Sequence, residues 1–92
     1  MTDVVVASSD IMVAHLEGEA VLLHLGTKRY FQLNCTGAHI WKLIAEGARH
    51  DAIVESLVTT FEVDPAQASD ALRHLVDDLL ENALVRERED AP

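Results

Sequence analysis

Apolar and polar residues alternate in the first third of the chain, and this pattern predicts a β-hairpin. The two apolar runs, 11–17 and 20–25, flank Gly18-Glu19, and a two-residue turn that begins with glycine favours a type II′ hairpin. In this register Met12 faces Leu25, and one face of the hairpin is wholly apolar. A slip of one residue would mix that face with polar positions, so the pattern supports the register. The apolar face comprises Met12, Ala14, Leu16, Val21, Leu23 and Leu25.

A third strand is predicted over 29–33, after Gly26-Thr27-Lys28. A three-residue loop with a bulge places Phe31 and Leu33 on the core face and leaves Gln32 outside. A four-residue loop would bury Gln32 instead, which is unfavourable for an unpaired amide. Lys28 occupies the loop position where glycine with a positive φ is usual.

Three helices are predicted after the strands, each by its own start and stop signals. Asn34 or Thr36 can cap the first, and Gly47 ends it. The second runs from about His50 or Asp51 to Phe61. Asp64-Pro65 is a cap followed by proline at the first helical position, which starts the third helix, and Asn82 ends it. The helical apolar positions are Ile40, Trp41, Ile44, Ile53, Val54, Leu57, Val58, Phe61, Ala68, Leu72, Leu75, Val76, Leu79 and Leu80.

The order of three strands followed by three helices predicts an α+β fold in which the helices cover one face of an antiparallel sheet. A length of 92 residues indicates one domain. We expect an N-terminal segment over 1–10, a folded domain over 11–86 and an acidic tail over 87–92. Val4-Val5-Val6 predicts an extra edge strand, and Leu84-Val85 predicts a short terminal strand or a packed tail.

Charge narrows the classes of partner. The chain carries 7 Lys and Arg against 16 Asp and Glu, for a net charge of −9. The second and third helices are spaced like a helix-turn-helix pair, but the third has only Arg73 against four acidic side chains. Phosphates are bound by cations, so nucleic acids and anionic membranes are disfavoured as partners.

No apolar window reaches the roughly 18 residues of a membrane span, and the N-terminus lacks the basic start of a signal peptide. The expected location is the cytoplasm.

Candidate catalytic and metal-binding residues are few. Cys35 stands near a predicted helix N-terminus, where a thiolate is favoured, and His39 is four residues further on. His15 and His24 share one face of the predicted hairpin, without a convincing third ligand. We therefore expect no catalytic residues, no metal and no cofactor, although a small Cys/His enzyme remains an alternative.

The third strand lies at the edge of a three-stranded meander, where its backbone groups can pair with an incoming strand. If the third helix crosses that edge, a peptide could pair with 29–33 and contact Leu72, Leu75, Val76 or Leu79. Such strand addition takes its affinity from backbone bonds and its specificity from apolar pockets. The other reading is that these side chains are simply core.

Several runs resemble the PqqD-like family, and more narrowly the small leader-binding proteins of lasso-peptide gene clusters. The resemblance covers roughly residues 11–86, and Lys28, Cys35 and Asn82-Ala83 depart from its pattern. The runs are Ala20-Val21-Leu22-Leu23-His24-Leu25, Arg29-Tyr30-Phe31-Gln32-Leu33-Asn34, Thr36-Gly37-Ala38, Ile40-Trp41, and the closing Leu75, Leu79-Leu80 and Ala83-Leu84-Val85.

The resemblance implies a winged-helix-like recognition element for ribosomally made precursor peptides, without catalytic activity of its own. Such proteins hold the leader peptide between the third strand and the third helix and present it to a leader peptidase or another maturation enzyme. The implied peptide-binding residues are Lys28, Arg29, Tyr30, Phe31, Gln32, Leu33, Ala68, Leu72, Arg73, Leu75, Val76 and Leu79. Lys28, Arg29 and Arg73 would face acidic leader side chains.

The resemblance gives Asn34, Thr36, Gly37 and Trp41 roles in holding the fold. An acidic winged-helix regulator stays an alternative function. Exchange of an element between two chains would give a homodimer, because exposed strand edges invite swapping.

Overall fold

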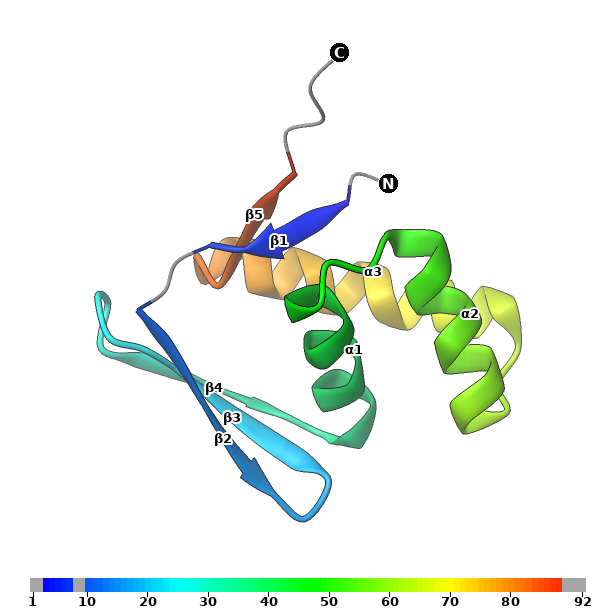
Figure 1. Cartoon of the computed structure of the whole chain (residues 1–92), viewed down its shortest axis with the longest axis horizontal. Helices are drawn as coiled ribbons and strands as arrows, with labels where there is room; N and C mark the ends of the chain where they lie inside the picture. The colour runs from blue at the N-terminus through cyan, green and yellow to red at the C-terminus, as the bar shows by residue number, and fades with distance from the viewer. Residues whose placement is uncertain (1–2, 8–9, 89–92) are drawn as a thin grey trace.

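A computed structural model describes residues 3–7 and 10–88 and shows the expected α+β fold (Figure 1). Its elements are β1 (Val4–Val6), β2 (Ile11–Leu16), β3 (Glu19–His24), β4 (Arg29–Leu33), α1 (Cys35–Ala45), α2 (His50–Phe61), α3 (Pro65–Glu81) and β5 (Val85–Glu87). Residues 1–2 and 8–9 of the expected N-terminal segment, and 89–92 of the expected acidic tail, lie outside the described residues.

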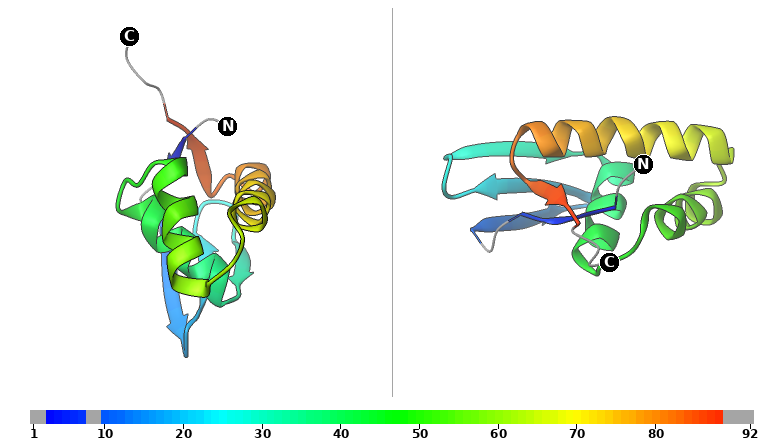
Figure 2. Two further views of the ribbon diagram at one scale, coloured as in Figure 1. Left: turned by 90° about the vertical axis from the view of Figure 1, so that its right-hand side faces the viewer. Right: turned by 90° about the horizontal axis from the view of Figure 1, so that it is seen from above.

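The strands form two antiparallel sheets. One is the predicted meander in the order β2-β3-β4, and the other pairs β1 with β5. The strand predicted at Val4–Val6 is therefore confirmed, and Val85–Glu87 form a strand rather than a packed tail. Helix α1 packs on β3 and β4, while α3 packs on α2 and β5. Helix α3 and strand β4 run in opposite directions along the molecule (Figures 1 and 2).

The β2–β3 hairpin turns one residue earlier than predicted. Its central residues are Glu17 and Gly18, with φ of +45° and +87°, and positive φ at both central positions is typical of a type I′ turn. Met12 consequently faces Leu23 rather than Leu25, so the predicted register is wrong. The partner of each residue shifts by two positions, which is an even number. Residues that were predicted to share a face of the hairpin therefore still share one.

The β3–β4 loop has four residues, 25–28, rather than the predicted three, because His24 pairs with Arg29. The amide of Lys28 donates to the His24 carbonyl oxygen at 2.8 Å, which closes the loop. Lys28 has a φ of +62°, so the left-handed residue expected at this position is present without glycine. The imidazole Nδ1 of His24 accepts from the Gly26 amide at 3.1 Å and so helps to order the loop.

The core face of the β2–β3 hairpin is opposite to the predicted one, because Leu22 is buried against the helices whereas Met12 is 57% exposed and Leu23 37% exposed. On β4 the prediction is confirmed, since Leu33 is buried and Phe31 half-buried on the core face. Strand β3 is apolar on both faces, so counting apolar residues could not decide which face the helices cover. Gln32 faces Val21 and remains exposed, because that side of the sheet has no helices on it.

The helices begin and end where their local signals predict. The Asn34 side chain caps α1 by accepting from the Gly37 amide at 2.9 Å, and Gly47 follows the helix with a φ of +86°. Asp64 caps α3 with Pro65 at the first helical position. Trp41 is buried in the core, as expected.

Helix α2 takes its N-terminal cap from a distant part of the chain. Its own N-cap residue, Arg49, makes no side-chain cap. Instead Asp3 accepts from the His50 amide at 2.7 Å and from the Arg49 guanidinium at 3.2 Å. This contact ties β1 to the start of α2.

The Asp3→Ala variant is expected to lower the free energy of unfolding by about 1–2 kcal/mol, because the His50 amide loses its acceptor. Chemical denaturation measures this change. The control is Asp70→Ala, which removes an exposed pair with Arg73 at 3.1 Å and is expected to cost less than about 0.5 kcal/mol. Equal effects for the two variants would contradict the capping role of Asp3.

Candidate functional site

Strand β4 forms one edge of the meander, so among the described residues its backbone has no strand partner on the side away from β3. Its side chains alternate between the two sheet faces. Phe31 and Leu33 point toward the helical side, where Leu33 is buried and Phe31 half-buried. Tyr30 and Gln32 lie on the opposite face. An incoming strand would therefore pair with the backbone groups of β4 that do not bond β3, although the Arg29 amide already donates to Thr27 Oγ1 at 3.4 Å.

A groove between α1 and α3 begins where β4 ends. It consists of two adjoining hollows of about 360 and 200 Å³, which share Thr36 and Ala71. The larger hollow is also lined by Asn34, Gly37, Ile40, His74, Leu75 and Asp78. We call the two together the α1–α3 groove. A strand that extends the sheet at β4 would run past Leu33 toward this groove.

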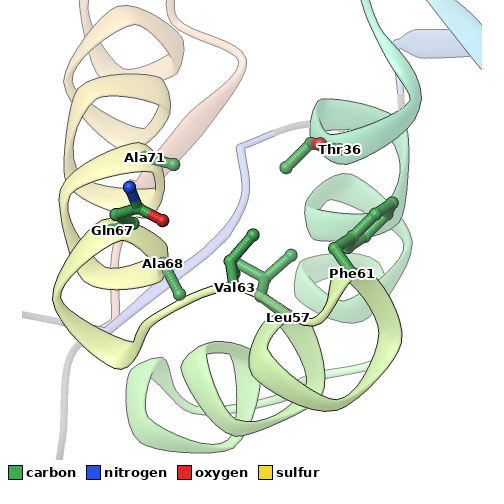
Figure 3. A pocket seen from close by; sticks show the side chains of 7 residues that line it. All are labelled: Thr36, Leu57, Phe61, Val63, Gln67, Ala68 and Ala71. Carbon is green, nitrogen blue, oxygen red and sulfur yellow. The ribbon is translucent and has the colours of Figure 1, made fainter.

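The smaller hollow lies where the three helices meet and is mostly apolar. Figure 3 shows Leu57 and Phe61 from α2, with Val63 from the loop after it, between α1 and the first turns of α3. Gln67 and Thr36 are the polar lining residues. A cavity of this kind, apolar with a few polar groups, suits a side chain or short peptide segment.

Gly37 lets the end of β4 approach the first turn of α1. A Cβ atom at this position would lie 3.2 Å from Leu33 Cδ2 and 3.3 Å from Leu33 Cβ. Together with the Asn34 cap, this close approach fixes the floor of the larger hollow. The expectation that Asn34 and Gly37 shape the fold agrees with these contacts.

The α3 residues of the groove form a stripe beside the core stripe of the same helix. Gln67, Ala71, His74, Leu75 and Asp78 recur at helical spacing on the groove side. Of these five residues, only Leu75 was predicted from the sequence to bind peptide. Their spacing was visible in the sequence, but mixed polar and small residues do not show which neighbouring element they face.

The structure divides the predicted helical residues between the core and the groove. Leu72, Val76 and Leu79 are buried in the core, where they hold α3 in place. Ala68 is also buried but contributes to the wall of the smaller hollow. Leu75 is half-buried and lines the larger hollow, so it joins core and groove.

The predicted cations do not gather in one place. Lys28 and Arg29 stand at the start of β4. Arg73 bonds Asp70 and lies on the side of α3 away from the groove residues, about 160° around the helix from Leu75. The groove itself has His74 and Asp78 at its rim. The groove therefore does not carry the cluster of cations that was expected to face acidic leader side chains.

The candidate nucleophile and its base do not face each other. Cys35 is exposed at the start of α1, while His39 Nε2 lies 2.9 Å from Ser56 Oγ and its ring stacks edge-on against Phe61. His39 therefore joins α1 to α2.

His15 and His24 are four residues apart along the β2–β3 ladder, because His15 pairs with Ala20 and His24 with Ile11. In the described part of the chain no three His, Cys, Asp or Glu side chains gather as metal ligands. Over the same residues, no helix has the length and apolar character to span a membrane.

Fold and groove together define a small α+β protein with an open sheet edge that leads into an apolar groove. The chain belongs to the PqqD family, described as coenzyme PQQ synthesis protein D, whose family model matches residues 19–85.

Two solved structures are similar to almost the whole chain. TbiB1, in complex with the TbiA(beta) leader peptide, is 34% identical with a TM-score of 0.82, over 91% of this chain and 98% of that chain. A lasso peptide synthetase B1, complexed with its leader peptide, is 29% identical with a TM-score of 0.77, over 86% and 93%. Among curated proteins, no sequence matches the chain.

Proposed function

We propose that this protein binds the leader peptide of a ribosomally made precursor, of the lasso class, and delivers it to a separate processing enzyme. The observation that carries the proposal is the likeness to TbiB1, which extends over nearly the full length of both chains. The structure of TbiB1 was solved in complex with a leader peptide. The open edge of β4 and the α1–α3 groove supply a site of the required shape.

The bound leader would extend the meander as a fourth strand at β4. Its backbone would pair with Arg29–Leu33, and its side chains on the helical side would enter the groove. Leu75, Ala71 and Ile40 offer the apolar contacts there. His74 and Asp78 would contact polar leader side chains at the rim. The buried residues Leu72, Val76 and Leu79 support this wall from behind.

The protein itself would be non-catalytic and cytoplasmic. His39 is engaged with Ser56, so a Cys35/His39 pair has no support in the geometry. The acidic surface of α3 likewise gives no support to a regulator that binds DNA. The processing enzyme, a leader peptidase or another maturation enzyme, would supply the chemistry.

Calorimetry with the leader peptide of a lasso-type precursor from the same genome tests the proposal. We expect the leader to bind with one site per chain, and the protein alone to leave the precursor uncleaved. Alkylation of Cys35 is expected to leave delivery intact, because the exposed thiol lies outside the residues that line the groove. Absence of leader binding, or precursor cleavage by the protein alone that alkylation abolishes, would contradict the proposal.

A further inference from the structure

The sheet face that points away from the helices carries an exposed apolar surface. Met12, Leu23 and Tyr30 form one row across the three strands, and Ala14 and Val21 lie in the next. These five residues, which we call the outer sheet face, line a shallow hollow of about 280 Å³ together with Val13. Tyr30 is 76% exposed and Met12 57%. Exposed apolar side chains that are contiguous across three strands form a candidate interaction surface.

We infer that the outer sheet face docks the enzyme that processes the bound precursor, an inference that rests on the proposed function. The groove and this face lie on opposite sides of the same sheet, so a leader in the groove leaves Met12 and Leu23 uncovered. Leader binding in the groove therefore does not account for the apolar character of Met12 and Leu23. The face therefore calls for a second partner.

The outer sheet face is continuous with the proposed leader strand. Side chains of a β-strand alternate between the two faces of a sheet. A leader paired with β4 would thus send half of its side chains toward the helices and half to the outer side, next to Tyr30 and Gln32. An enzyme on this face would contact the protein and the leader at once, and would bind the loaded protein more tightly than the free one.

A second copy of the chain is a poorer occupant than an enzyme. The outer sheet face crosses three strands about 4.8 Å apart and extends for three to four residues along each of them. It therefore presents roughly 200 Å², against about 800 Å² per partner in a stable interface. Each copy also carries a net charge of −9, which opposes association.

The charges around the face describe the partner. Glu17 and Glu19 stand at the hairpin end of the face and Lys28 stands in the loop at the opposite end, whereas Arg29 lies on the helical side of the sheet with Phe31. An enzyme surface with an apolar centre and basic side chains toward the hairpin end would fit this arrangement. The small area suits a transient contact, which the shared precursor would strengthen by raising the effective concentration.

The test compares Met12→Asp with His15→Asp. The two positions lie on the same edge strand, but His15 points to the other sheet face and is also exposed. The assay uses a lasso-type precursor and a leader peptidase from the same genome, with the peptidase kept dilute. We expect Met12→Asp to leave the leader Kd unchanged within about twofold and to slow precursor cleavage about tenfold or more. His15→Asp is expected to behave as wild type.

The outcomes separate the docking inference from the proposed function. If the wild-type protein fails to bind leader, the proposed function fails. If leader binding is intact and Met12→Asp cleaves as fast as His15→Asp, only the docking inference is overturned. It is also overturned if Met12→Asp weakens leader binding, or if sedimentation shows a wild-type dimer that Met12→Asp dissociates. Circular dichroism verifies that both variants are folded.

Discussion

Leader affinity is expected to fall by at least about 100-fold in the Leu75→Asp variant. Leu75 lines the larger hollow of the groove, opposite Ile40 and Gly37. A leader side chain seated there would bury the new carboxylate without a partner, and burial of an unpaired charge is strongly unfavourable. Isothermal titration calorimetry with the leader peptide measures the loss.

A second variant separates binding from folding, because Leu75 is half-buried and contributes to the core. Ala71 is exposed and lines both hollows, so Ala71→Glu fills the groove and leaves the core unchanged. Its control is Ala66→Glu, which places the same side chain on α3 about 140° away around the helix. If Ala71→Glu and Ala66→Glu bind leader equally well, the peptide does not enter the groove.

The helices were predictable from the sequence because their signals are local. The cap at Asn34, the stop at Gly47 and the Asp64-Pro65 start each act within one turn of the helix they delimit. All three stand where expected. The trans cap from Asp3 was not predictable, since 46 residues separate it from Arg49.

The sheet was harder to predict because register depends on contacts distant in sequence. Gly18 fits the first position of one turn type and the second of another, and the structure uses it as the second. Leu22 and Leu23 are both apolar, so the choice of buried face depends on where the helices pack. The fold class survived these errors because it requires only the order of elements.

The candidate site likewise has one part that follows from the order of elements and another that depends on how the helices pack. Strand β4 could be proposed from its edge position, which follows from the strand order alone. The groove required the position of α3 relative to α1, which separates Leu75 from its buried neighbours Leu72, Val76 and Leu79. The exposed face with Met12 and Leu23 was mistaken for core, since an apolar face that binds a partner looks the same in sequence as a core face.

Addition of the leader is expected to slow amide exchange at alternate residues of β4. On an edge strand every second amide points away from the sheet, and those amides would gain partners from an added strand. The amides between them already bond β3. With leader at about 100 times its Kd, the outward amides should exchange up to about 100-fold more slowly, as measured by NMR.

The other edge of the same sheet provides the control for this experiment. Strand β2 (Ile11–Leu16) also has one unpaired side, but it carries no contact to the α1–α3 groove, and its amides are expected to keep their exchange rates. Leader bound only through side chains in the groove would leave β4 exchange unchanged, and so contradict strand addition. Protection of the β2 amides instead would show that the peptide pairs with β2 and would contradict binding at β4. Because backbone pairing and groove contacts belong to one bound peptide, Ala71→Glu should abolish the β4 protection as well as the affinity.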